Sequence, residues 1–143
     1  MTHDSSCIFC KIINGDIPSA KVYEDEAVYA FLDISQVTKG HTLLIPKTHT
    51  QDIYSTDEQT AEKLFARVPK VANAIKNAFE PIGLNLLNNN EAPAGQSVYH
   101  LHIHLIPRYG ENDGFEPNWI VHTDDYSNDD LQAMAKQINE RIS

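Results

Sequence analysis

The spacing of hydrophobic residues changes along this chain of 143 residues, and the changes predict both helices and strands. In residues 56–79, apolar side chains recur at intervals of three and four, as they do on the buried face of a helix. Ser55 or Thr56 can cap the start of that helix, and Pro81 and Gly83 are expected to end it. The pattern therefore predicts one long central helix.

Short segments rich in β-branched and aromatic residues predict the strands. They occupy residues 21–24, 27–33, 42–45, 83–88 and 98–106. A last helix is expected to start at Ser127 or Asn128 and to run to Ile142. In a β-α-β fold a helix regularly follows each strand. The order of elements here does not alternate in that way, and so it favours the α+β class. The length suits a single domain, residues 1–143.

Composition adds a constraint on charge. The chain has 11 Lys and Arg against 20 Asp and Glu, a formal net charge of −9. General binding to nucleic acid or to an anionic membrane needs a dense cationic face, so we expect neither kind of partner. An anionic ligand would have to be held by a compact local site, which favours one small molecule over a polymer.

The sequence has neither a membrane span nor a signal peptide that we recognise. The longest apolar run, residues 27–32, is far shorter than the roughly 20 residues of a membrane helix. Residues 1–6 lack a cationic start and an apolar stretch. The two cysteines, Cys7 and Cys10, form a C-x-x-C pair, which cannot staple a secreted fold. We therefore expect a cytoplasmic protein whose cysteine pair serves metal or redox chemistry.

Three histidines alternate with apolar residues in segment 98–106. In a strand this spacing would place His100, His102 and His104 on one face and apolar side chains on the other. A lone histidine on a strand is usually structural, but three in strict alternation favour a functional site. Same-face residues repeat at about 6.6–6.8 Å, so the outer two would lie about 13 Å apart and one metal ion could hardly take all three. A better fit is attack of a neutral imidazole on phosphorus while a neighbouring imidazole donates to the phosphoryl oxygens.

The segment just upstream has the composition of an anion-binding loop. Gly95 permits close approach of the backbone. The backbone amides of Gln96 and Ser97 and the side chain of Asn88 could then hold a phosphate. Neither a Walker-type phosphate loop nor a dinucleotide-binding glycine fingerprint occurs, which argues against an ATPase or a dehydrogenase.

Residues 95–106, which read Gly-Gln-Ser-Val-Tyr-His-Leu-His-Ile-His-Leu-Ile, resemble the signature of the histidine triad (HIT) family. Other segments resemble family segments in the family's order, namely residues 7–11, 31–34 and 40–49. The resemblance covers a core of about residues 7–108 and does not extend to residues 109–143. It implies a bent antiparallel sheet with a long central helix and a C-terminal helix, joined across a homodimer.

The same resemblance implies a nucleotide hydrolase or transferase that displaces a group from the α-phosphorus. His102 would be the nucleophile and would form a nucleotidyl-histidine intermediate, which water resolves. His104 would contact the phosphoryl oxygens and the leaving group, and the backbone carbonyl of His100 would orient the nucleophile. The other matches are to positions that contact the leaving group (Ser97), the phosphate (Asn88 and Gln96), the base (Phe9, Phe31 and Ile34) and the ribose (Asp33), and to a further active-site histidine (His41).

The cysteine pair alone could be redox-active, structural or part of the core. The resemblance points to a zinc-containing variant in which His49 and His100 join Cys7 and Cys10. Four such ligands would form a closed, structural Zn²⁺ site and not a catalytic one. That site would tie the N-terminal segment to the histidine segment and fix His100 beside the nucleophile.

Several functions remain open at this point. Residues 97–99 resemble the adenosine 5'-monophosphoramidase branch of the family, which favours hydrolysis of purine nucleoside phosphoramidates or related nucleotide conjugates. Residues 106–108 also suit the branch that cleaves diadenosine polyphosphates. A zinc-stabilised nucleotide-binding module with little turnover is a third interpretation. A metallohydrolase with His102 and His104 as ligands is disfavoured by the strand geometry.

Overall fold

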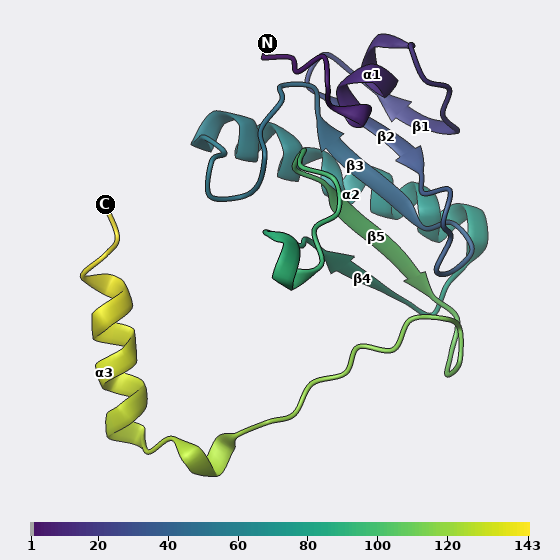
Figure 1. Cartoon of the computed structure of the whole chain (residues 1–143). Helices are drawn as coiled ribbons and strands as arrows, with labels where there is room; N and C mark the ends of the chain where they lie inside the picture. The colour runs from purple at the N-terminus through teal and green to yellow at the C-terminus, as the bar shows by residue number, and fades with distance from the viewer. Residues whose placement is uncertain (1) are drawn as a thin grey trace.

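The computed structural model describes residues 2–143 and contains a five-stranded antiparallel sheet (Figure 1). The strands lie side by side in the order β1-β2-β3-β5-β4. The elements in chain order are α1 (Ile8–Asn14), β1 (Lys21–Glu24), β2 (Val28–Leu32), β3 (Thr42–Pro46), α2 (Glu58–Phe79), β4 (Gly83–Leu87), the 3₁₀ turn η1 (Ala92–Ala94), β5 (Ile103–Arg108), the 3₁₀ turn η2 (Thr123–Asp125) and α3 (Asn128–Asn139). The predicted α+β class is confirmed.

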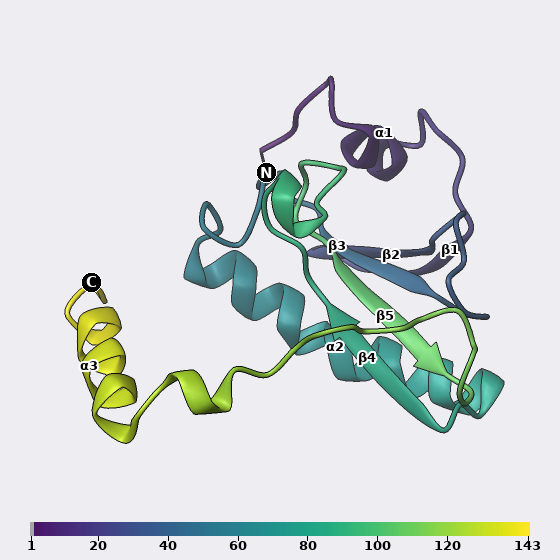
Figure 2. The same cartoon turned by 60° about the horizontal axis from the view of Figure 1, so that its bottom comes forward.

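The central helix α2 covers one face of the sheet, opposite α1 (Figure 2). Its buried side chains are Leu64, Val68, Val71 and Ile75, at the intervals of four, three and four that predicted the helix. They pack against apolar residues of β2, β3 and β5. This layer is one of two cores, and it holds the sheet against α2.

The short helix α1 builds the second core on the opposite face. Phe9, Cys10 and Ile12 pack there against β2 and β3, where they meet Phe31 and Leu43. Strands β2 and β3 are therefore buried on both faces. That is why their sequences are almost continuously apolar and do not alternate with polar residues.

The start of α2 differs from the prediction. Asp57, and not Ser55 or Thr56, is the N-cap, and its carboxylate accepts a hydrogen bond from the backbone N–H of Thr60 at 2.8 Å. The hydroxyl groups of Ser55 and Thr56 instead donate to Asp52, at 3.0 and 2.6 Å. Both candidate caps are thus engaged in the loop that precedes the helix.

The histidine segment is not the continuous strand that its alternation predicted. Strand β5 begins at Ile103, and residues 98–102 have irregular backbone, so only His104 of the three histidines lies on a strand. The physical reason is that pairing with the neighbouring strand β3 stops at Leu44 and Ile103: the N–H of Leu101 donates at 2.7 Å to the carbonyl of Thr50, which lies in the loop beyond β3. The three imidazoles are therefore not constrained to one face.

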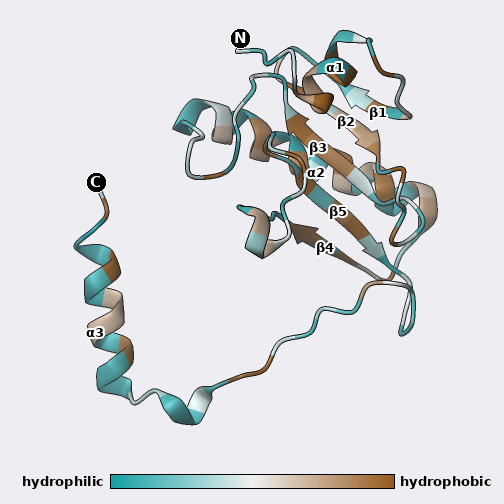
Figure 3. Ribbon diagram, in the orientation of Figure 1, coloured by the Kyte–Doolittle hydropathy of each residue, from teal (hydrophilic) through white to brown (hydrophobic). Residues whose placement is uncertain are grey.

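Residues 116–143 extend away from the sheet and are exposed throughout (Figure 1). Helix α3 begins with a capping box, in which Ser127 and Asp130 each accept a hydrogen bond from the backbone N–H of the other. It ends at Asn139 and is shorter than predicted, and its apolar residues gather on one side (Figure 3). Within residues 2–143, none of the helices combines the length and the hydropathy that crossing a membrane requires.

Candidate active site

A cavity of about 380 Å³ opens on the α1 side of the sheet. Its walls come from α1, β2, the turn after β2, β3 and the segment that leads into β5. The predicted site residues that line it are Phe9, Phe31, Asp33, Ile34, Ser97, His102 and His104. The volume is that of a small-molecule pocket. Folding thus brings these positions together from separate parts of the sequence.

One wall of the cavity is aromatic. The ring of Phe9 meets Phe31 edge to face, with centroids 5.4 Å apart, and meets His102 in the same way at 5.2 Å. Ile34 stands at the rim with 98% of its surface exposed. Ile12 also lines this wall, and sequence reasoning missed it. The spacing of three residues from Phe9 on a short helix was the available signal.

The hydrogen bond at Nδ1 of His102 fixes which of its two ring nitrogens carries the proton. Nδ1 lies 2.7 Å from the backbone carbonyl oxygen of His100, which can only accept, so the ring proton is on Nδ1. Burial lowers the pKa of His102, so the ring is neutral near pH 7. The side-chain amide of Asn88 donates to the carbonyl of His102 at 3.0 Å and holds its backbone. Nε2 of His102 therefore presents an unshared electron pair to the cavity.

A chain of hydrogen bonds gives His104 the opposite role. The backbone N–H of Val37 donates to Nδ1 of His41 at 3.2 Å, so the proton of neutral His41 is on Nε2. That Nε2–H donates to Nδ1 of His104 at 2.9 Å, which leaves the proton of His104 on its own Nε2. Burial lowers the pKa of His41, and it lowers the pKa of His104 to about 4. His104 is thus a neutral hydrogen-bond donor beside His102, with ring centroids 5.0 Å apart.

Asp33 lies next to this relay. One carboxylate oxygen accepts from the N–H of Ser35 at 2.8 Å, and the other is 3.6 Å from Nε2 of His41. Asp33, His41 and His104 together have the composition of a metal site, with their ligand-type atoms within 4.8 Å of one another. However, Nε2 of His41 carries a proton directed at His104 and has no free electron pair for a metal. The arrangement favours a hydrogen-bond relay.

A second cluster lies behind the cavity. The sulfur and nitrogen atoms of Cys7, Cys10, His49 and His100 all lie within 4.8 Å of one another. Cys7 Sγ and His100 Nδ1 are 3.5 Å apart, Cys10 Sγ and His49 Nδ1 are 3.4 Å apart, and the two Nδ1 atoms are 3.2 Å apart. A tetrahedral zinc ion with ordinary bond lengths separates its ligand atoms by about 3.3–3.8 Å. The cluster therefore has the donor set and the dimensions of a closed zinc site.

The tautomer of His100 also fits a metal ligand. Its Nε2 lies 2.8 Å from the carbonyl oxygen of Pro46, which accepts the ring proton and leaves Nδ1 unprotonated toward the thiols. Burial lowers the pKa of His100 to about 4, which keeps the ring neutral. A carboxylate oxygen of Asp4 lies 3.9 Å from Nε2 of His49 on the outer side. One residue, His100, thus contributes its side chain to this cluster and its carbonyl to His102.

Comparison with known proteins agrees with this geometry. Residues 14–111 match the family model described as the HIT domain. The chain belongs to the HIT family. Protein hit of Bacillus subtilis is 62% identical over 138 residues, which cover 96% of this chain and 95% of that one. The crystal structure of a member of the HIT family from Bacillus subtilis has a TM-score of 0.95 at 61% identity and covers 97% of this chain and 99% of that one. The predicted family and its fold are confirmed.

Two other HIT proteins are described in terms of their chemistry. A protein of Schizosaccharomyces pombe named adenosine 5'-monophosphoramidase is 37% identical over 96% of this chain and 98% of its own. The crystal structure of a Zn-bound histidine triad family protein from Mycobacterium smegmatis has a TM-score of 0.73 at 33% identity, over 96% of this chain and 98% of that one.

In this HIT domain, some residues predicted to contact phosphate lie outside the lining of the cavity. Both hydrogen bonds from the amide nitrogen of Gln96 go to backbone carbonyls, of Gln51 at 2.7 Å and Val98 at 3.1 Å. Gly95 closes the η1 turn, and Asn88 binds the carbonyl of His102 as described above. Gln96 and Asn88 therefore shape the loop that carries Ser97 and the histidines, while Ser97 reaches the cavity.

Proposed function

We propose that this HIT protein hydrolyses purine nucleoside phosphoramidates or related nucleotide conjugates at the α-phosphorus. The observation that carries the proposal is the pairing of two neutral imidazoles with opposite tautomers in one cavity. His102 offers a free electron pair at Nε2, and His104 offers an N–H. A nucleophile beside a preorganised donor is what displacement at a phosphoryl group requires. The name of the fission-yeast relative, adenosine 5'-monophosphoramidase, supports this substrate class.

The proposed reaction uses these groups in turn. Nε2 of His102 bonds to phosphorus while the bond from phosphorus to the leaving amine breaks, and the amine takes a proton from solvent. The N–H of His104 donates to a phosphoryl oxygen as charge develops there. The carbonyl of His100 stabilises the Nδ1–H of His102 once that ring is nucleotidylated and cationic. Water then attacks phosphorus as the bond from phosphorus to Nε2 of His102 breaks, the attacking water gives up one proton to solvent, the nucleoside monophosphate departs, and His102 is neutral again.

The rest of the cavity suits the nucleoside and the leaving group. Phe9 and Phe31 offer an aromatic slot for a base, with Ile34 at its rim. The Asp33 carboxylate can accept hydrogen bonds from ribose hydroxyls, since only one of its oxygens is engaged by a backbone N–H. The hydroxyl of Ser97 is available at the same wall for a leaving group.

Hydrolysis of diadenosine polyphosphates is the second candidate. Neither Lys nor Arg is among the residues that line the cavity within the described part of the chain. A polyphosphate leaving group would bring further negative charge to a protein of net charge −9 with no cation at the site to receive it. An uncharged amine carries no such penalty. The lining of the cavity therefore favours the phosphoramidate.

We also infer that Cys7, Cys10, His49 and His100 hold a structural Zn²⁺ ion. The donor set, the spacing and the tautomer of His100 support it, as does the Zn-bound mycobacterial relative. Four protein ligands leave no open position for substrate, so zinc would supply folding energy and no catalytic step. It would hold α1, and hence Phe9, against the cavity.

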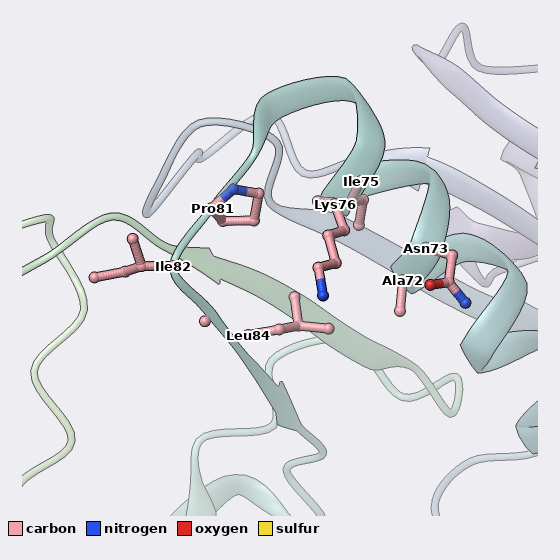
Figure 4. A pocket seen from close by; sticks show the side chains of 8 residues that line it. Ala72, Asn73, Ile75, Lys76, Pro81, Ile82 and Leu84 are labelled. Atoms are coloured by element: carbon pink, nitrogen blue, oxygen red, sulfur yellow. The ribbon is translucent and has the colours of Figure 1, made fainter.

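A homodimer is the third part of the proposal. Among the described residues strand β4 is an unpaired edge, and Ile82 just before it and Leu84 and Leu86 on it are between 37% and 78% exposed. A groove of about 250 Å³ lies between β4 and the end of α2, with Ile75, Lys76 and Leu84 around it (Figure 4). The exposed apolar side of α3 also lacks a partner within the described residues. A two-fold contact between copies would cover these surfaces together. The cytoplasmic location stays a prediction.

One experiment separates the candidate functions. Wild type and His102→Ala are assayed on adenosine 5'-phosphoramidate and diadenosine tetraphosphate, with and without a chelator. We expect turnover of the phosphoramidate, loss of that turnover in His102→Ala, and no immediate effect of the chelator. Preference for the tetraphosphate would favour the second candidate, and AMP binding without turnover of either would favour a binding module. Immediate, reversible loss with chelator would indicate a catalytic metal.

A further inference from the structure

We infer that Gly114 and Tyr109, in the turn formed by residues 109–115 just after β5, position the active site through their contacts with the loop of residues 36–40, with Gly114 acting on Val37 and, through it, on His41. The inference rests on the proposed role of His104 as a donor. The last four residues of the turn lie beyond the part of the chain that matches the HIT family model, residues 14–111, and none of the turn's residues lines the cavity. Its contacts nevertheless lead to the hydrogen-bond relay that fixes the tautomer of His104.

The turn is rigidly attached to the sheet. The carboxylate of Asp113 accepts hydrogen bonds from Nε and Nη2 of Arg108, at 2.8 and 3.1 Å, and from the backbone N–H of Tyr109 at 2.9 Å. Hydrogen bonds from Arg108 hold the pKa of the Asp113 carboxyl well below its usual range, so the pair stays charged. Arg108 also donates to Asn85 of β4 at 3.0 Å. The turn is therefore anchored to both β5 and β4.

The anchored turn contacts the loop of residues 36–40 at two points. The hydroxyl of Tyr109 donates to the carbonyl of Lys39 at 2.6 Å. At Gly114, where φ is +107°, an added Cβ would lie 2.3 Å from the carbonyl oxygen of Val37. Contact this close is possible only for glycine. The backbone of Val37 is therefore confined on one side by the turn.

Val37 also contacts His41: the N–H of Val37 donates to Nδ1 of His41 and so selects the tautomer of that histidine. The same loop is closed by Gln36, whose amide donates to the carbonyl of His41 at 2.7 Å and accepts from the N–H of Gly40 at 2.9 Å. If Val37 moves, His41 loses the donor that keeps its proton on Nε2. His104 then loses the donor that keeps its own proton directed into the cavity.

The chain offers a matched pair of glycines to test this inference. Gly114→Ala adds a methyl group that must be relieved by a shift of about 1 Å, from 2.3 Å to an ordinary contact of 3.4 Å. Gly110→Ala imposes the same kind of backbone strain, at φ +138°, with nothing within 4 Å of the added carbon. A misplacement of about 1 Å can cost up to about 10²-fold in rate. We expect Gly114→Ala to lower kcat about 10- to 100-fold and to change the AMP affinity by less than about twofold. In Gly110→Ala we expect kcat and AMP affinity each to stay within about twofold of the wild-type value.

A second measurement does not depend on turnover. In ¹⁵N-labelled protein, the imidazole nitrogen shifts of His41 report its tautomer directly. We expect wild type and Gly110→Ala to carry the proton on Nε2, and Gly114→Ala to show mixed tautomers at both His41 and His104. If the proposed function failed but the relay were right, these shifts would still change. Equal kcat and unchanged histidine signals in the two alanine variants would overturn the inference.

The smaller change Tyr109→Phe covers the case in which Gly114→Ala does not fold. It removes only the hydrogen bond to Lys39, and far-UV circular dichroism checks that the fold is kept. We expect a roughly two- to fivefold lower kcat and broadened His41 signals, both smaller effects than those of Gly114→Ala. Unchanged kcat and unchanged His41 signals in folded Tyr109→Phe would contradict the inference.

Discussion

Replacing His104 by leucine removes one hydrogen-bond donor from the cavity and keeps much of the side-chain volume. In the structure His41 donates to Nδ1 of His104 at 2.9 Å, so the proton of His104 lies on Nε2. Because burial lowers the pKa of His104 to about 4, this donor is a neutral imidazole at pH 7. Loss of this donor should raise the free energy of the transition state, in which negative charge develops on the phosphoryl oxygens, more than it weakens binding of the ground state.

The size of the effect follows from comparable donors. Loss of one preorganised donor to a developing oxyanion costs about 10²–10³ in kcat, or about 2.7–4 kcal/mol. We expect His104→Leu to lower kcat by such a factor while the AMP dissociation constant changes by less than about threefold. His104→Gln keeps an N–H donor, in a side chain of similar length, and we expect its kcat to be about tenfold higher than that of His104→Leu.

The assay is steady-state hydrolysis of adenosine 5'-phosphoramidate, with AMP affinity from calorimetry and thermal unfolding as a check of the fold. If folded His104→Leu keeps more than about a tenth of the wild-type kcat, the donor role is wrong. A loss that lies wholly in AMP affinity would also refute the reasoning, since the interaction would then act in the ground state.

Three further predictions concern the Cys/His cluster, the base slot and the pH dependence of stability. In Cys10→Ser we expect elemental analysis to find no bound zinc, and the free energy of unfolding to be lower by more than about 2 kcal/mol. If the variant keeps one zinc per chain, this ligand set is wrong. Phe9→Ala should raise the AMP dissociation constant, measured by calorimetry, about 5- to 150-fold, because stacking of one base on an aromatic ring contributes about 1–3 kcal/mol. An unchanged dissociation constant would show that Phe9 does not contact the base. His104 binds a proton below about pH 6.5 in the unfolded state, but only below about pH 4 in the folded state. Because protons then bind preferentially to the unfolded state, the free energy of unfolding should fall as the pH drops from 6.5 to 4. In urea titrations this decrease should be smaller in His104→Gln, and an equal decrease would contradict the low pKa.

The extent of sequence-based prediction can be judged from the histidine segment. Its composition indicated phosphate chemistry, and the pattern along the chain placed the central helix and the other four strands near their observed bounds, whereas the strand predicted over residues 98–106 begins only at Ile103. The alternation rule failed at His100 because it assumed a partner strand: β3 continues to Pro46, but its pairing with β5 stops at Leu44 and Ile103, and the N–H of Leu101 bonds to the carbonyl of Thr50 instead. A property of one segment thus depended on how it pairs with another, which local patterning does not contain.

The tautomers of the histidines lay equally beyond the sequence. They depend on the carbonyls of His100 and Pro46 and the N–H of Val37, which are ordinary backbone groups. Only folding decides which of them meets a ring. The C-x-x-C pair was visible as a potential metal site, but its histidine partners, His49 and His100, came from the family resemblance and not from spacing.

The proposed mechanism is tested most directly by looking for the covalent intermediate. Wild-type protein is mixed with adenosine 5'-phosphoramidate, quenched in alkali within a single turnover, digested and analysed by mass spectrometry. We predict an adenylyl group on Nε2 of His102, formed and consumed at rates consistent with kcat, and absent in His102→Ala. Turnover at the full rate with no adduct at any time, or with the adduct on another residue, would contradict the mechanism.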